Sequence, residues 1–215
     1  EIEEAKKEKR HVIVADSDYR FSHIYVGPFG RNEGIQAHSH SLTQGEFTVT
    51  GWDWSPDGQS IVFAHQPDPR INTGRLAGDI SVVSMAHSEG GQMGEEQAEE
   101  QEHRVPIRHL VEGDGVEGSP RWSPDGRWIA YETRVRGQLD IWLIDQTGSI
   151  NFPIIQHDRS DEAPSWSPDG RKLTFSSARR GRFDLYVMDW NGENLMRLTQ
   201  RSGKNIQPDW GPQTR

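Results

Sequence analysis

The sequence contains no cysteine among its 215 residues. This absence excludes disulfide bonds, thiolate zinc sites and cysteine nucleophiles. Apolar residues are also scarce, at 32% of the chain, so any core must be thin and spread over many elements. No apolar run approaches the 18 residues that a transmembrane helix needs, and we therefore expect no membrane insertion.

Positive charge is in short supply as well. The chain carries 24 Lys and Arg against 33 Asp and Glu, a formal net charge of −9. A general nucleic-acid-binding protein needs a basic surface, so we expect no nucleic-acid partner. No signal peptide is visible and the chain begins at Glu1 rather than Met, so we expect a processed, trimmed or excised piece.

What the chain does have is a repeat marked by tryptophan. Trp54, Trp122 and Trp166 each open the string Trp-Ser-Pro-Asp-Gly, and Trp210 opens a shortened copy, Trp-Gly-Pro. The steps between successive tryptophans are 68, 44 and 44 residues. A period in the mid-forties indicates a repeat architecture.

One unit, residues 163–200, predicts four short strands, which we name a to d. Strand a surrounds Trp166, strand b covers 171–177, strand c covers 183–188 and strand d covers 195–200. Pro-Asp-Gly predicts a tight turn between a and b. Asn191-Gly192 predicts a hairpin turn between c and d in which both residues take positive φ.

The fold class expected from these units is all-β. A four-stranded sheet that must stack on its neighbours to bury both faces is the blade of a β-propeller, and we predict about four antiparallel blades. The recurring tryptophan is expected to pack between neighbouring blades. The Asp of Pro-Asp-Gly is expected to belong to the turn.

The predicted boundaries are a charged leader at 1–10 and a propeller at 11–215. Three complete blades cover 52–110, 120–155 and 164–199. The first blade, 11–43, lacks strand a, and a strand at 206–210 would supply it and close a four-bladed ring. An open arc would instead expose strand edges and require a larger parent ring or a homodimer. Residues 87–104 form an acidic insert, read as a tolerated loop or as a partner-binding segment.

Several strings resemble known families. Trp-Ser-Pro-Asp-Gly-Arg-Lys-Leu-Thr-Phe (166–175) and Asp-Leu-Tyr-Val-Met-Asp-Trp-Asn-Gly-Glu-Asn (184–194) resemble the WD-type repeat of TolB-like propellers, a likeness that covers about residues 11–212. The strings at 3–7, 18–21, 51–58 and 79–83 are similar to the propeller of prolyl-oligopeptidase-family serine peptidases. In that family the propeller caps a hydrolase domain and filters what reaches its catalytic triad.

The sequence departs from the peptidase family at the site of chemistry. Gly-x-Ser-x-Gly, the turn that presents a serine nucleophile, does not occur. The resemblance therefore implies a propeller of peptidase ancestry and not a peptidase. It implies a cytoplasmic location for a peptidase-like chain and a periplasmic one for a TolB-like chain.

Candidate binding residues are arginines in the predicted loops between strands b and c. These loops share one end of the blades with the connections from d to a. Seven arginines gather there: Arg70, Arg75, Arg134, Arg136, Arg179, Arg180 and Arg182. They predict a site for carboxylates, such as peptide C-termini or acidic side chains. The alternative is mutual ion pairing with neighbouring loop acids, which contributes little to stability.

Other candidate chemistry is sparse. His38 and His40 stand two apart on a predicted strand, so both imidazoles lie on one face, a possible pair of metal ligands. A structural zinc site needs four ligands, and two solvated strand residues are the alternative. Asp79, Asp140 and Asp184 recur in register on strand c, which indicates a role in building blades.

These observations predict a non-catalytic β-propeller scaffold, with no cofactor, that binds a peptide or protein at its arginine-lined end. Two alternatives stay open. One is the substrate-gating propeller of a prolyl-oligopeptidase-like peptidase whose hydrolase domain is absent here. The other is a propeller lyase or lactonase that works at the central channel.

Overall fold

The computed structural model describes residues 10–16, 21–28, 40–67, 78–85, 106–113, 115–134, 137–200 and 203–211; side chains of 10–16, 28 and 40 are not described. Every regular element in these ranges is a strand, and four antiparallel sheets follow one another along the chain. No helix in the described part of the chain is long and apolar enough to cross a membrane. The all-β, blade-by-blade prediction is confirmed.

The three complete sheets have the strand order of the predicted a-b-c-d unit. The second blade contains β4 (Thr48–Trp54), β5 (Ser60–Gln66), β6 (Asp79–Ser84) and β7 (Ile107–Val111). The third contains β8 (Glu117–Trp122), β9 (Trp128–Arg134), β10 (Leu139–Asp145) and β11 (Asn151–Ile155). The fourth contains β12 (Asp161–Trp166), β13 (Lys172–Ser177), β14 (Asp184–Asp189) and β15 (Met196–Arg197).

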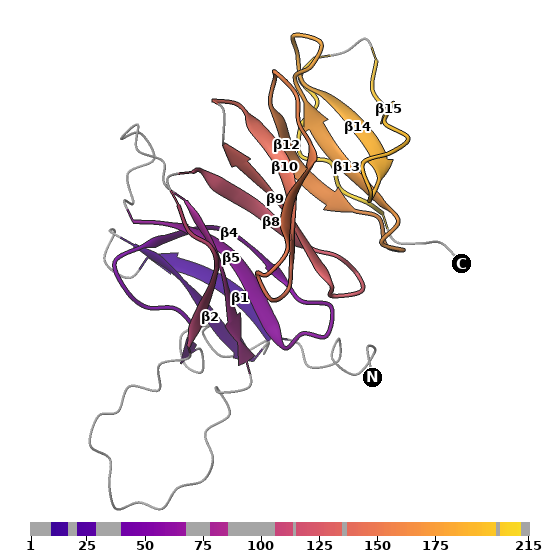
Figure 1. Ribbon diagram of the computed structural model, residues 1–215. Helices are drawn as coiled ribbons and strands as arrows, with labels where there is room; N and C mark the ends of the chain where they lie inside the picture. Colours follow the sequence, from indigo (N-terminus) through magenta and orange to yellow (C-terminus); the bar gives the residue numbers. More distant parts are fainter. Residues whose placement is uncertain are drawn as a thin grey trace, which may run out of the picture.

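The first sheet has three strands, β1 (Arg10–Asp16), β2 (Ser22–Pro28) and β3 (His40–Ser41). It lies at the opposite end of the stack from β12–β15, so the blades form an open arc (Figure 1). Residues 206–210 form no strand, and none of these five residues pairs with β1. The predicted strand at 206–210 is absent from this structure, and ring closure stays a prediction.

Residues 203–211 nevertheless lie on the fourth blade as a strand a would. Trp210 Nε1 donates to the Ser165 carbonyl at 3.1 Å, as Trp166 Nε1 donates to the Arg121 carbonyl at 3.1 Å. Gln207 has a φ of 55°, close to the 53° of Ala163 at the equivalent place in the fourth blade. The last repeat therefore retains contacts typical of strand a, although no described strand b lies beside it.

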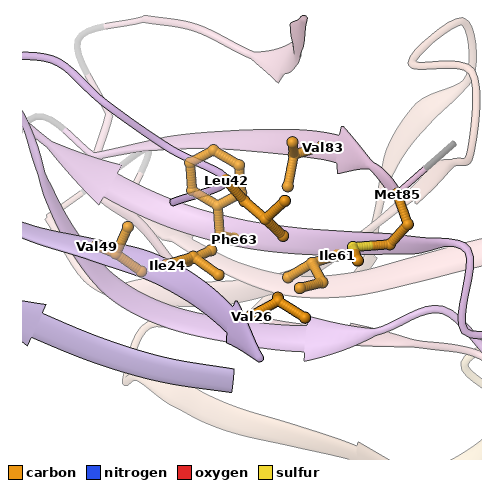
Figure 2. Packing of buried hydrophobic residues seen from close by; sticks show 8 residues of the cluster. All are labelled: Ile24, Val26, Leu42, Val49, Ile61, Phe63, Val83 and Met85. Carbon is orange, nitrogen blue, oxygen red and sulfur yellow. The ribbon is translucent and has the colours of Figure 1, made fainter. Parts of the chain in front are cut away.

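The described residues form three core clusters, each shared by two adjacent blades. In the first, Ile24, Val26 and Leu42 of the first blade meet Ile61 and Phe63 of the second, among other apolar side chains (Figure 2). The second and third clusters join the next two pairs of blades. Trp122 and Trp166 lie in these two clusters and are 8% exposed, which agrees with packing between blades.

The Pro-Asp-Gly turns are built by their own polar side chains. In the fourth blade, Ser167 Oγ donates to Asp169 Oδ1 at 2.6 Å, and the Arg171 amide donates to the same oxygen at 3.1 Å. Gly170 has a φ of 69°, which favours glycine. The second and third blades repeat these contacts, so the aspartate belongs to the turn.

The Asn191-Gly192 turn differs from the prediction. Gly192 has a φ of 87°, but Asn191 does not take positive φ. The Gly192 amide donates to the Asp189 carbonyl at 2.9 Å, and the Asp189 amide donates to the Glu193 carbonyl at 2.9 Å. The chain reverses over a longer loop, because the tight turn closes between Asp189 and Gly192 and not at the predicted pair.

Candidate functional site

The candidate site is the end of the blades where strands a and c begin and strand b ends, which we call the rim. In the fourth blade, strand pairing places Asp161 and Asp184 on either side of Ser177. In the third blade, it places Glu117 and Asp140 on either side of Thr133. These two blades therefore bring two carboxylates and a hydroxyl to the same place at the rim.

The structure describes four of the seven predicted arginines. Arg70, Arg75 and Arg136 lie outside the described residues, as do His38 and the side chain of His40. Arg134 and Arg180 are exposed. Arg179 and Arg182 are engaged by buried carboxylates of the fourth blade. The four described arginines are therefore of two kinds, ion-paired (Arg179 and Arg182) and unpaired among the described residues (Arg134 and Arg180), although the sequence predicts the same role for all of them.

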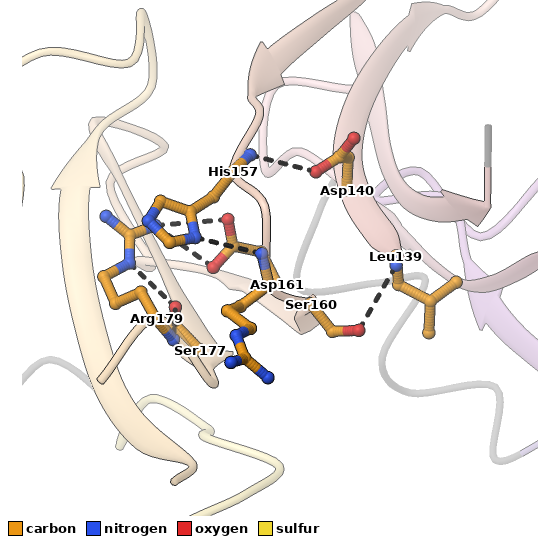
Figure 3. A network of polar contacts seen from close by, with 8 residues as sticks. Leu139, Asp140, His157, Ser160, Asp161, Ser177 and Arg179 are labelled. Atoms are coloured by element: carbon orange, nitrogen blue, oxygen red, sulfur yellow. Dashed lines mark hydrogen bonds and ion pairs between the residues drawn. The ribbon is translucent and has the colours of Figure 1, made fainter. Parts of the chain in front are cut away.

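Arg179 belongs to a polar network in the fourth blade (Figure 3). Its Nη2 lies 3.1 Å from both carboxylate oxygens of Asp161, and its Nε donates to Ser177 Oγ at 2.8 Å. The Arg179 side chain is 13% exposed and that of Asp161 is fully buried. The guanidinium group also lies over two rings, 4.7 Å from the Tyr186 centroid and 5.7 Å from that of Phe175.

Asp184 is a second buried carboxylate in the same blade. Arg197 Nη2 lies 2.6 Å from Asp184 Oδ2, Arg182 Nε lies 3.5 Å from it, and Thr199 donates to Oδ1 at 3.3 Å. Burial alone would raise the pKa of Asp184, but the two guanidinium groups outweigh burial and hold the pKa below its usual value. Arg182 is still 46% exposed, so it also faces solvent.

The rim of the second blade carries two imidazoles and a carboxylate around a serine hydroxyl. Ser81 Oγ lies 2.8 Å from His65 Nε2 and 3.0 Å from His109 Nδ1, and His109 lies 3.4 Å from Glu112. Burial lowers the pKa of His65, so its imidazole stays neutral at neutral pH. Ser81 is fully buried, so its hydroxyl is not available as a nucleophile.

Two acids of the third and fourth blades are perturbed by burial. Burial raises the pKa of Glu117, and the nearby Asp79 raises it further. Burial, followed by the charge of Glu132, also raises the pKa of Glu162. Glu132 itself accepts hydrogen bonds from Ser119 Oγ and from the Ala163 amide, both at 2.9 Å, so it links the third blade to the fourth.

No group of three or more His, Asp or Glu able to hold a metal ion occurs among the described residues. The strand-c aspartates differ in their partners. Asp79 accepts from the Gly113 amide at 3.3 Å and Asp140 accepts from the His157 amide at 3.2 Å. These contacts, like the one between Asp184 and Thr199, tie strand c to the connection that follows strand d.

The inner strands present a polar line that sequence reasoning missed. The residue before each repeated tryptophan is Asp53, Arg121, Ser165 or Asp209. Asp53 accepts the Trp122 amide at 2.8 Å, and burial raises its pKa to about 6. Aligning the four repeats on their tryptophans would have found this line, because its members share one position.

Comparison with known proteins places this geometry in a family. The family described as "PD40: TolB beta propeller domain" matches residues 102–215. An uncharacterized protein of Agrobacterium fabrum is 30% identical over 96 residues, which are 45% of this chain and 25% of that protein. The chain therefore spans about a quarter of the curated relative that it matches.

Solved structures share the fold at low identity. TolB from Acinetobacter baumannii has a TM-score of 0.68 at 16% identity, over 93% of this chain and 43% of that one. A puromycin-hydrolyzing peptidase of Mycobacterium tuberculosis has a TM-score of 0.66 at 14% identity, over 92% and 31%. A chain in a structure of a nidogen/laminin complex has a TM-score of 0.59 at 13% identity, over 89% of this chain and 62% of that one. With its repeated Trp-Ser-Pro-Asp-Gly turns and stacked four-stranded blades, the chain belongs to the TolB beta-propeller domain family.

Proposed function

We propose that this chain is a non-catalytic scaffold that binds a peptide or protein at the rim. The observation that carries the proposal is the division of the rim arginines. Arg179 is held inside the fourth blade by Asp161, whereas Arg134 and Arg180 are exposed and form no ion pair with any described residue. Arg134 is close enough to Glu162 for its charge to lower the pKa of that acid. Exposed guanidinium groups are free to form charge-assisted bonds with carboxylates of a partner.

The comparisons support a role in binding. The same fold occurs in a structure of a nidogen/laminin complex, and so takes part there in a complex between proteins. It also occurs in a puromycin-hydrolyzing peptidase, which supports the second candidate, a propeller that gates access to a hydrolase domain. A hydrolase domain encoded in the flanking reading frame would favour that candidate.

A test uses a fluorescein-labelled hexaglutamate peptide and fluorescence anisotropy at low and physiological salt. We expect the Arg134→Ala/Arg180→Ala variant to bind about tenfold more weakly than the unaltered chain, because two charge-assisted bonds are lost. Arg171→Ala is the matched control, since Arg171 is exposed in the a–b turn at the opposite end of the fourth blade. Equal affinities for all three proteins would reject the proposed rim.

A further inference from the structure

The fourth blade contains a slot that is filled by a guanidinium group. Asp161 supplies two carboxylate oxygens at 3.1 Å from Arg179 Nη2, and Ser177 supplies a hydroxyl at 2.8 Å from its Nε. The rings of Phe175 and Tyr186 lie against the guanidinium plane. A carboxylate, a hydroxyl and aromatic faces are the groups that recognise guanidinium.

The third blade contains the same set of groups, 44 residues earlier in the chain. Their counterparts are Glu117, Thr133, Tyr131 and Trp142. Strand pairing confirms that the positions correspond. Glu117 pairs with Thr133 as Asp161 pairs with Ser177, and Tyr131 pairs with Trp142 as Phe175 pairs with Tyr186.

Among the described residues, no arginine pairs with Glu117 as Arg179 pairs with Asp161. The sequence has Val135, not arginine, 44 residues before Arg179. Glu117 is 8% exposed, and its Oε1 accepts from Thr133 Oγ1 at 2.8 Å. Its Oε2 is buried and has no hydrogen-bond partner in the described part of the chain. Leaving a buried carboxylate oxygen unpartnered costs free energy, which a donor from outside would recover.

The surroundings of Glu117 favour a cation. Burial and the neighbouring carboxylate of Asp79 both raise its pKa, and among the described residues the hydrogen bond from Thr133, not a lysine or arginine, opposes them. By contrast, Arg197 and Arg182 lower the pKa of the buried Asp184. A positive group beside Glu117 would therefore be attracted by two carboxylates at once.

Two glycines border Glu117, Gly115 at its carboxylate and Gly78 at its main chain. A Cβ at Gly115 would lie 2.1 Å from Glu117 Oε1, and one at Gly78 would lie 2.7 Å from the Glu117 carbonyl oxygen. The amide of Gly78 donates to the carbonyl of Gly115 at 3.1 Å, which holds the two segments together. No side chain from these two positions covers the carboxylate, so the slot borders only main chain there.

We propose that the slot of Glu117, Thr133, Tyr131 and Trp142 binds the guanidinium group of an arginine side chain supplied by a peptide partner. The partner arginine would occupy in the third blade the place that Arg179 occupies in the fourth. This inference rests on the proposed function in one respect, that the rim receives a peptide. It adds a basic residue to the acidic ones that Arg134 and Arg180 would attract.

The test is an NMR titration of the unaltered chain with N-acetyl-arginine N-methylamide at constant ionic strength. We expect saturable shifts of the amide signals of Gly115 and Glu117. The citrulline analogue has the same shape without the charge, and we expect it to give no saturable shift. Glu117→Gln should weaken binding about tenfold or more, because the charge-assisted bonds are lost. Glu117→Asp, which reproduces the carboxylate of the fourth blade, should retain binding.

A matched control comes from the fourth blade. Arg179→Ala empties the filled slot, and the arginine derivative should then shift the amide signals of Asp161 and Ser177 as well. Shifts at the emptied fourth-blade slot without shifts at Gly115 and Glu117 would overturn the proposal. No saturable shift in either protein, equal binding of arginine and citrulline, or unchanged binding by Glu117→Gln would also overturn it.

The outcome separates this inference from the proposed function. The hexaglutamate experiment depends on Arg134 and Arg180 and not on Glu117. Loss of acidic-peptide binding with the arginine titration intact would reject the proposed carboxylate rim and leave the slot standing. Intact binding of the acidic peptide without saturable shifts in the arginine titration would reject the slot and leave the proposed carboxylate rim standing.

Discussion

Replacing Arg179 with alanine tests whether the fourth-blade ion pair is part of the fold. The Asp161 side chain is fully buried and Arg179 is 13% exposed, so removing the arginine leaves a carboxylate without its counter-charge in the interior. Breaking a buried pair in this way costs about 3–5 kcal/mol. The stacking of the guanidinium on Tyr186 and Phe175 is lost as well, so we expect a loss of at least about 3 kcal/mol.

Urea unfolding followed by tryptophan fluorescence measures this loss. For a small protein the urea slope is about 1–3 kcal/mol per molar, so the midpoint should fall by about 1 M or more. Arg180→Ala is the matched control. Arg180 is exposed, so its removal should change the free energy of unfolding by no more than about 0.5 kcal/mol. An Arg179→Ala variant that loses less than about 1 kcal/mol would refute the structural role of this pair.

Three further predictions concern the blades. Burial raises the pKa of Asp53 from its usual 3.8 to about 6 in the folded chain, so the folded state binds this proton more tightly than the unfolded state does. Stability should therefore fall by about 3 kcal/mol as the pH rises from about 4 to 6, and Asp53→Asn should remove that fall in a pH series of urea midpoints. Trp166→Phe removes an indole that packs between blades and donates a hydrogen bond, and should cost about 1–3 kcal/mol by the same unfolding assay. Gly192→Ala places a Cβ 2.8 Å from a third-blade carbonyl at a φ of 87°, whereas Gly181→Ala, at a φ of 84°, meets nothing within 4 Å. The first variant should lower the melting temperature more than the second, and equal losses would show that contact between blades is not the cause.

Much of the fold follows from the spacing of a few residues. The tryptophan period and the Pro-Asp-Gly turns predict the blades, because turn chemistry and strand period are local properties of the sequence. The turn after strand c was predicted less well. Asn-Gly favours a two-residue turn, but in the structure only Gly192 takes positive φ and Asp189 closes the turn.

The rim was harder to predict from sequence. Arg179 and Arg180 are adjacent and chemically identical, yet one is paired with the buried Asp161 and the other is exposed. Their difference depends on the direction in which each side chain leaves the loop, and composition carries no information on that direction. The Glu117 slot needs a comparison between blades at the level of strand pairing, which the structure supplies.

The central claim is that some rim arginines build the propeller and others are available to bind. One measurement tests it most directly: hexaglutamate affinity and urea midpoint, determined together for Arg179→Ala and for Arg134→Ala/Arg180→Ala. We predict that Arg179→Ala lowers the midpoint and, under conditions where it is folded, keeps most of its affinity. The double variant should keep its midpoint and lose affinity. The opposite pattern, with affinity lost on removing Arg179 and stability lost on removing Arg134 and Arg180, would contradict the account.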